Sequence, residues 1–240
     1  MKVFLAVPEN LSSQDIISIT YPQEPSGVEK DKWGQKVALF DVKKLPAQER
    51  YASVMKVEAN IYSVMYHVFP EKVGKLKDIP GNLSRFLEND DKYRLNDPAI
   101  QKAVKEAVGE EENPYWIARN IFDYLRDKLF YERIGGWDIA PTILERGSGS
   151  CSEYAFLYIA MCRAAGVPAR YAGSVVVRGE DASFDFVYHR WVEIYLPGYE
   201  WIPVDPSRGV TVGVGVLALS FGHLSNHFLI YLPGTVRRNI

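Results

Sequence analysis

The pattern of apolar and polar positions divides the chain into a strand-rich first part and a second part that mixes helices with strands. Between Met55 and Ile61 apolar residues alternate with polar ones, as expected of a half-buried strand, and a long strand is predicted from Tyr51 to Val68. Proline-containing turns separate three further predicted strands, over residues 3–7, 15–21 and 36–42. We therefore expect residues 1–95 to form a small antiparallel β-domain.

Helical patterns begin after Asn96, which places the expected second domain at residues 96–240. Asp97-Pro98 and Asn113-Pro114 each combine an N-cap residue with proline at the first helical position. The second of these helices carries an apolar stripe formed by Ile117, Ile121, Tyr124 and Leu125. The run Tyr154–Ala165 is apolar nearly all round, which predicts a helix buried on every side.

Cys151 stands where a glycine-rich turn becomes this buried helix. Ser150 can act as the N-cap and Glu153 can close a capping box, so Cys151 is expected to be the first helical residue. A helix N-terminus stabilises negative charge, and the thiolate is the nucleophilic form of cysteine. A lone cysteine is more often a packing residue, so the assignment depends on finding a base.

A hairpin further along the chain supplies that base. Strands are predicted on both sides of a turn at Leu196-Pro197-Gly198. A hairpin centred on Pro197 places His189 directly opposite Asp205 and on one sheet face with four neighbours, namely Trp191, Glu193, Trp201 and Pro203. The opposite face is wholly apolar and contains Val192, Ile194, Ile202 and Val204. Pairing alone thus brings a histidine to a carboxylate that can orient it.

These residues resemble the core of the transglutaminase-like superfamily over roughly residues 115–209. The resemblance rests on the Gly-Ser-Cys helix start, the segment 163–170, His189 before Trp-Val-Glu, and the strand 201–206 with its Asp-Pro end. It implies an α+β fold with a papain-like core, in which a nucleophile helix packs on an antiparallel sheet. It also implies Cys151 as nucleophile, His189 as general base and acid, and Asp205 as orienter.

Two details qualify the resemblance. A small residue commonly follows the histidine in this family, whereas this chain has Arg190, which could narrow the site or add a charge that faces the substrate. Arylamine N-acetyltransferases resemble the Arg-Gly turn before the cysteine, but the Trp-x-x-x-Asp-Pro strand and the β-rich lead-in are transglutaminase-like.

The activity that the resemblance implies is cysteine-dependent acyl chemistry on an amide bond, with hydrolysis of a peptide or amide as the favoured outcome. Transglutaminase-type cross-linking, with an amine as acceptor, is the alternative. A catalytically inert protein-binding module is the alternative from another class. Cys151 is expected to supply one oxyanion donor through its backbone N–H, and Trp137 is the candidate for the second, with Trp116 as the other possibility.

Composition adds limits. The formal net charge of −2 provides no basic field for nucleic acid. The partner that the resemblance implies is a peptide or protein substrate. His223 and His227 have i, i+4 spacing, but the surrounding pattern is not helical, and we expect neither a metal nor a cofactor. Cys162 lies about 16 Å from Cys151 along the same predicted helix, too far for a disulfide, and is expected to be a core residue.

Nothing in the sequence marks a targeting segment or a membrane span. The short apolar run Val3–Val7 is interrupted by Pro8, and the longest apolar stretch near the C-terminus, Val210–Phe221, is too short to cross a bilayer. Both cytoplasmic and secreted locations therefore remain open, as does the oligomeric state. The loop Arg178–Asp185 is expected to contribute to specificity without a readable code.

Overall fold

A computed structural model describes residues 1–31, 34–133, 137–177, 188–208 and 220–232. The loop 178–185 and most of the apolar stretch 210–221 lie outside the described residues. The chain forms two compact units, and each is composed of more than one segment. The first contains residues 1–63, 173–188 and 225–240, and the second contains residues 64–172 and 189–224. These units do not follow a single cut of the chain, so the boundary between residues 95 and 96 stays a proposal.

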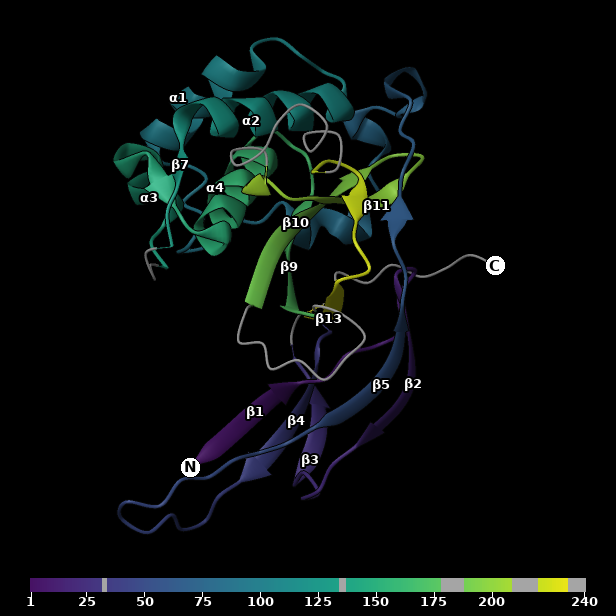
Figure 1. Cartoon of the computed structure of the whole chain (residues 1–240). Coiled ribbons are helices and arrows are strands. Elements are labelled where there is room, and N and C mark those ends of the chain that lie inside the picture. Colours follow the sequence, from purple (N-terminus) through teal and green to yellow (C-terminus); the bar gives the residue numbers. More distant parts are fainter. Residues whose placement is uncertain (32–33, 134–136, 178–187, 209–219, 233–240) are drawn as a thin grey trace. The chain divides into compact units, whose positions relative to one another are not determined.

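The first unit is built from strands (Figure 1). Strands β1 (Lys2–Ala6), β4 (Lys36–Asp41) and β3 (Gly27–Lys30) form an antiparallel sheet in that order. Strand β2 (Gln14–Thr20) pairs with β5 (Lys56–Ile61) across a bulge after Ile16. A small core of Val7, Ala38 and Phe40 lies beneath them. The predicted strands at 3–7, 15–21 and 36–42 are confirmed, and the strand predicted within 51–68 is shorter.

The end of strand β9 (Ala169–Val176) belongs to the first unit, where Gly173–Val176 pairs with β13 (Phe228–Leu232). The buried Gln14 side chain ties this pair to β2. Its amide donates to the Ile230 carbonyl at 2.9 Å and accepts from the Ile230 N–H at 2.8 Å. Segments from both ends of the chain therefore complete the unit, which local sequence patterns cannot show.

The second unit mixes helices with strands. Three short 3-10 helices, η1 (Pro70–Lys72), η2 (Leu76–Asp78) and η3 (Gly81–Phe86), lead to helices α1 (Pro98–Val108) and α2 (Pro114–Lys128). The Asp97 and Asn113 side chains cap α1 and α2 as predicted, because each accepts a backbone N–H two residues on. Next follow β7 (Phe130–Tyr131), α3 (Ala140–Arg146), β8 (Ser148–Gly149) and α4 (Cys151–Ala164).

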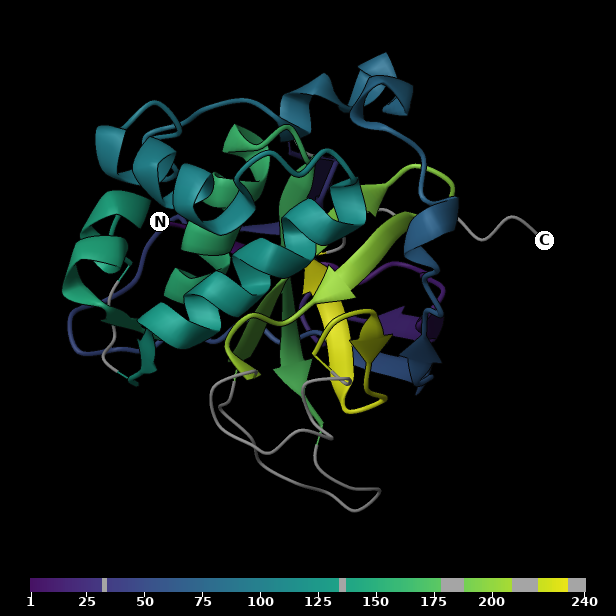
Figure 2. The ribbon, with the colours of Figure 1, turned by 90° about the horizontal axis from the view of Figure 1, so that it is seen from above.

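Helix α4 is the centre of the second unit. Every residue from Ser152 to Arg163 is buried, as the apolar run predicts. Helices α1, α2 and α3 all pack against it, and Figure 2 shows the helices gathered on one side of the strands. The other side of the core is the apolar sheet face predicted from the hairpin, consisting of Val192, Ile194, Ile202 and Val204. Helix α4 is thus held between helices and sheet, which confirms the α+β fold class.

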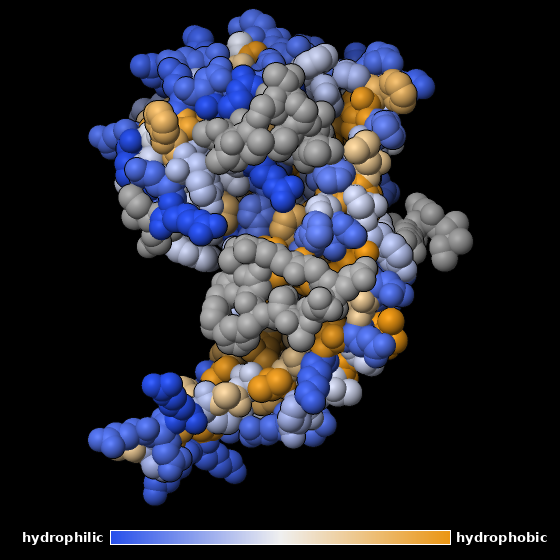
Figure 3. Space-filling model, viewed as in Figure 1, coloured by the Kyte–Doolittle hydropathy of each residue, from blue (hydrophilic) through white to orange (hydrophobic). Residues whose placement is uncertain are grey.

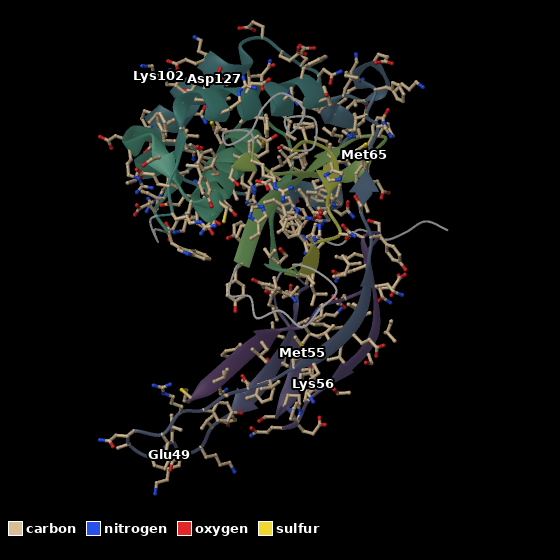
Figure 4. All side chains as sticks on the ribbon, viewed as in Figure 1. Glu49, Met55, Lys56, Met65, Lys102 and Asp127 are labelled. Carbon is tan, nitrogen blue, oxygen red and sulfur yellow. The ribbon has the colours of Figure 1, made fainter. Side chains whose placement is uncertain are left out.

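Strands β10 (Tyr188–Leu196) and β11 (Glu200–Val204) form the hairpin, and β10 lies between β11 and β9. Two short strands, β6 (Val64–Met65) and β12 (His223–Leu224), pair beside it, and Met65 is labelled in Figure 4. Hydrophilic residues cover the visible surface over the helices (Figure 3). No helix in the described part of the chain is long and apolar enough to span a bilayer.

Candidate active site

Cys151 is the first residue of α4, as the sequence predicts. Gly147 ends α3 in the left-handed region at φ 72°, and Ser148–Gly149 then pairs in parallel with Phe130–Tyr131. Ser150 is the extended N-cap residue, and its N–H donates to the Glu153 carboxylate at 2.9 Å. The unpaired N–H groups of the first turn and the helix dipole therefore lie at the thiol, where they stabilise negative charge.

An ion pair between the buried Glu153 and the partly exposed Arg146 holds the turn that presents Cys151. The fully buried Glu153 accepts from Arg146 at 2.8 Å, and Arg146 also donates to the Ser148 carbonyl at 2.9 and 3.1 Å. Gly149 is required here, since an added Cβ would lie 2.9 Å from the Glu153 Cβ. Sequence reasoning assigned Glu153 to the cap but missed Arg146 and Gly149. The Arg-Gly-x-Gly spacing before the cysteine is the signal that could have indicated both.

The predicted register of the hairpin is wrong by two residues. Val192 pairs with Val204 and Leu196 with Glu200, so the turn is Pro197-Gly198-Tyr199 and is centred on Gly198 rather than on Pro197. Gly198 has a φ of 92°, which explains the glycine at this position. His189 is consequently not directly opposite Asp205.

The two side chains meet nevertheless. A shift of two residues keeps every side chain on its predicted face, because side chains alternate with period two. His189 Nε2 lies 2.5 Å from Asp205 Oδ2, and both side chains are largely buried. The side chain of His189 is also hydrogen-bonded to Cys151. Because Nε2 faces the carboxylate, Nδ1 is the nitrogen available to the thiol.

Asp205 is held by the turn that follows it. The Ser207 hydroxyl donates to Asp205 Oδ1 at 2.7 Å, and Arg208 Nε lies 3.6 Å from Oδ2. Ser207 was missed in the sequence, although Asp-Pro at the start of a turn predicts that the aspartate accepts from residues two or three positions on. These contacts leave Oδ2 aimed at the histidine.

The electrostatics of the three side chains favour an ion pair. Burial raises the pKa of the Cys151 thiol, but hydrogen bonds from His189 and from the Arg190 backbone outweigh burial, and the pKa falls below its ordinary value. Burial lowers the pKa of His189, whereas Asp205 and Cys151 raise it to about 9. Burial likewise raises the pKa of Asp205, yet His189 and the Ser207 hydroxyl bring it below its usual value. These interactions therefore stabilise the thiolate and the imidazolium as a pair.

The part of the chain that contains these three side chains is similar to a known protein family. Residues 101–206, which include Cys151, His189 and Asp205, match the family model of the transglutaminase-like superfamily. The chain carries a transglutaminase-like domain. Members of this superfamily are typically cysteine enzymes, so cysteine-dependent chemistry is supported at that coarse level.

Individual proteins are also similar to this chain in sequence or in structure. The human peptide-N(4)-(N-acetyl-beta-glucosaminyl)asparagine amidase is 29% identical over 97 residues, and the rat protein matches equally well. The match covers 40% of this chain but only 13% of either amidase. A crystal structure of a candidate cysteine protease from Cytophaga hutchinsonii superposes with a TM-score of 0.65 at 19% identity. It covers 96% of this chain and 75% of that protein, which shows a shared fold.

Two tryptophans were candidates for the second oxyanion donor of the transglutaminase-like domain. Trp137 is 61% exposed, and its ring packs 5.3 Å from Phe156 and 6.4 Å from Tyr171. The Tyr171 hydroxyl donates to Ser152, the neighbour of Cys151, at 3.1 Å. Trp116 instead lies on α2 with its ring against Tyr115. These contacts place Trp137 near the start of α4, and its role as an oxyanion donor stays a prediction.

Cys162 and Glu193 are both structural. Cys162 is fully buried, and burial raises the pKa of its thiol far above that of Cys151, as expected of an unreactive core residue. Glu193 was the second carboxylate predicted on the histidine face. It is buried and accepts from Arg170 at 2.8 Å, and the Arg170 guanidinium stacks 3.7 Å from the Trp201 ring. The Glu193 carboxylate is thus occupied within the protein.

His223 and His227 lie in different units of the chain. His223 pairs with Met65 in β12, whereas His227 belongs to the first unit, where Nδ1 lies 3.1 Å from the Val177 carbonyl oxygen. Neither lies on a helix. Among the described residues no group of three or more metal-ligating side chains occurs.

Proposed function

We propose that this protein is a cysteine hydrolase that cleaves a peptide or another amide through Cys151, His189 and Asp205. One observation carries the proposal: His189 is bonded to the Asp205 carboxylate at 2.5 Å and also to the thiol at the start of α4. Covalent acyl transfer requires a nucleophile, a base that contacts it, and a group that orients the base. We further propose residues 96–240 as the catalytic domain and residues 1–95 as the β-rich domain that precedes it.

In the first half of the reaction, the Cys151 thiolate attacks the amide carbonyl and forms a carbon–sulfur bond. The negative charge that develops on the carbonyl oxygen is stabilised by the Cys151 N–H, with the Trp137 indole as the proposed second donor. The His189 imidazolium then donates its proton to the leaving nitrogen, and the carbon–nitrogen bond breaks. An acyl-enzyme thioester and a free amine result.

In the second half, neutral His189 takes a proton from water, which attacks the thioester. The tetrahedral intermediate collapses, the carbon–sulfur bond breaks, and a carboxylic acid and the Cys151 thiolate are regenerated. Asp205 keeps the same imidazole tautomer throughout and stabilises the charge on the ring. The proton that Nδ1 takes from water is therefore the one that it donates to the leaving nitrogen in the next turnover.

The burial of Glu193 supports water over an amine as the second acceptor. A carboxylate near the thioester is one way to hold an incoming ammonium group, and Glu193 was the candidate on the histidine face. Because Arg170 already neutralises it, Glu193 is not available for that purpose. This leaves hydrolysis favoured over cross-linking.

The test is to incubate the protein with glutaminyl and peptidyl substrates in the presence of a primary amine and to quantify both products by mass spectrometry. Free acid is expected to dominate at modest amine concentrations. If the amine adduct formed in clear excess, transglutamination would replace hydrolysis as the proposed reaction. Failure of iodoacetamide to label Cys151 in the folded protein, with labelling only after denaturation, would favour an inert binding module.

Activity should depend on pH in a bell shape. Thiolate forms as pH rises through the lowered pKa of Cys151, and the imidazolium of His189 is lost as pH rises through about 9. Since the two groups interact, the two limbs report the pair rather than either residue alone. We expect kcat/KM to rise as the thiolate of Cys151 forms and to fall above about 9. A rate that keeps rising well beyond that pH would contradict the imidazolium assignment.

A further inference from the structure

Cys151 and His189 lie on different elements, so their hydrogen bond requires the start of α4 to stay fixed against β10. The core between α4 and the sheet is apolar. Burial of apolar surface has no preferred direction, whereas a hydrogen bond fixes both a distance and an angle. A polar contact at the N-terminal end of α4 is therefore well suited to set the distance between the sulfur and the imidazole.

Tyr171 on β9 makes such a contact, and β9 lies next to β10 in the sheet. Its hydroxyl donates at 3.1 Å to Ser152, a buried residue that directly follows Cys151. Its ring stacks on the buried Phe156 with a centroid separation of 5.3 Å and an interplanar angle of 20°. Ser152 and Phe156 are four residues apart and share one face of the helix. Tyr171 thus contacts α4 at two successive turns, and the polar contact is at the turn that begins with Cys151.

The same hydroxyl is also linked to β10. The Arg190 side chain is hydrogen-bonded to Tyr171, and its Nη1 donates to the His189 carbonyl at 2.9 Å. The Arg190 backbone is hydrogen-bonded to Cys151. A phenol can hold two such partners because its oxygen accepts one hydrogen bond while its proton is donated in another. Tyr171 therefore joins the start of α4 to the residue that follows His189.

The Tyr171 hydroxyl keeps its proton while the site titrates. Burial raises the pKa of Tyr171 to about 12, although its hydrogen bonds to Ser152 and Arg190 oppose this rise. The pKa of His189 is raised only to about 9, and that of Cys151 is lowered. Tyr171 is therefore a neutral donor over the pH range in which Cys151 and His189 change charge, so it is not an acid or base of the reaction.

We propose that Tyr171 is a positioning residue, whose hydroxyl holds Cys151 at hydrogen-bonding distance from His189. The inference rests on the proposed hydrolase function and identifies a contact that sets the geometry of its nucleophile and base. Without the hydroxyl, the ring can still stack on Phe156, but the bond to Ser152 is lost. A displaced sulfur has a weaker hydrogen bond to the imidazole and a poorer approach to the carbonyl carbon.

The first test measures the rate at which iodoacetamide alkylates Cys151 as a function of pH and needs no knowledge of the substrate. The thiolate forms a carbon–sulfur bond, and iodide leaves. Tyr171→Phe is expected to move the midpoint of this profile to higher pH, because a weaker bond to His189 lowers the pKa of the thiol less. Below the midpoint the rate should fall about fivefold, as the loss of one hydrogen bond predicts.

Tyr158→Phe is the matched control. Tyr158 is fully buried on α4, and its hydroxyl donates to the Ala118 carbonyl at 2.9 Å. The variant therefore loses a buried hydroxyl from the same helix, two turns away from the thiol. It should lower the free energy of unfolding but leave the alkylation profile unchanged. An unchanged profile in Tyr171→Phe, or an equal shift in Tyr158→Phe, would overturn the positioning role.

Ser152→Ala removes the other end of the hydrogen bond. It should also move the midpoint to higher pH. The double variant of Tyr171→Phe and Ser152→Ala should match Tyr171→Phe alone, because the bond is already absent. Two shifts that simply add would show that the hydroxyls act independently, which contradicts the proposal.

The last test is turnover of a peptide that the parent protein cleaves. Tyr171→Phe should lower kcat about tenfold with little change in KM, because the lost contact joins two parts of the protein and does not bind substrate. Cleavage that depends on Cys151, with kcat and the alkylation profile unchanged in Tyr171→Phe, overturns the positioning role and leaves the hydrolase proposal intact. A shifted profile with no cleavage of any peptide supports the positioning of the thiol and counts against the hydrolase alone.

Discussion

Replacing Cys151 by alanine is expected to abolish both covalent labelling and turnover while the protein stays folded. The thiol is partly accessible at the N-terminus of α4, and its removal leaves the Arg146–Glu153 pair that holds the turn intact. Without the sulfur no acyl-enzyme can form, so the loss should reach the background rate. Mass spectrometry after iodoacetamide treatment, together with a turnover assay, measures the effect.

Cys162→Ala is the matched control for this variant. Cys162 is buried in the same helix, so its replacement leaves a small cavity and is expected to cost about 1 kcal/mol of unfolding free energy. Activity and labelling of Cys151 should persist. If the Cys151 variant were as active as the parent, the nucleophile assignment would be abandoned.

Asp205→Asn is expected to give the second large effect. The amide keeps the shape of the carboxylate but cannot stabilise the charge on His189, whose pKa depends on that charge to reach about 9. It can also hold the ring in the wrong tautomer, which lowers kcat by about 10⁴-fold in the serine protease triad. We expect a loss of 10³-fold or more here on the same grounds, measured as kcat on a cleaved peptide.

Ser207→Ala separates charge from orientation. It removes the hydroxyl that donates to Asp205 Oδ1 at 2.7 Å but leaves the carboxylate charge in place. Its loss of activity should therefore be far smaller than that of Asp205→Asn. Equal losses in the two variants would show that Asp205 acts through the shape of its turn rather than through its charge.

The Arg146–Glu153 pair holds the start of α4, where Cys151 lies. Glu153 is fully buried, and a buried carboxylate without its partner is costly. Here it neutralises Arg146 and caps α4 at the same time, so one side chain links α3, the glycine turn and the helix start. The position of the thiol therefore depends on this neighbouring ion pair.

Local features of the sequence determined the elements of this protein. Residues within one or two helical turns predict three features of the helices. These are the N-caps at residues 97 and 113 with the prolines that follow them, the apolar run of α4, and the capping box at Ser150. The face on which His189 and Asp205 lie was also predictable, because period-two alternation survives a register error of two residues. The nucleophile, base and orienter could therefore be proposed together.

Tertiary structure decided everything that depends on contacts between distant segments. The hairpin register was set by the left-handed backbone at Gly198, which the choice of Pro197 as the centre overlooked. Glu193 looked available on the histidine face until Arg170, from a neighbouring strand, neutralised it. Arg190 could be noted as unusual from the sequence, but only the structure shows that its guanidinium donates to the His189 carbonyl at 2.9 Å and is hydrogen-bonded to the Tyr171 side chain. The physical reason is common to all three: local patterns determine which way a side chain points, whereas its partner is chosen by chain segments that only packing brings together.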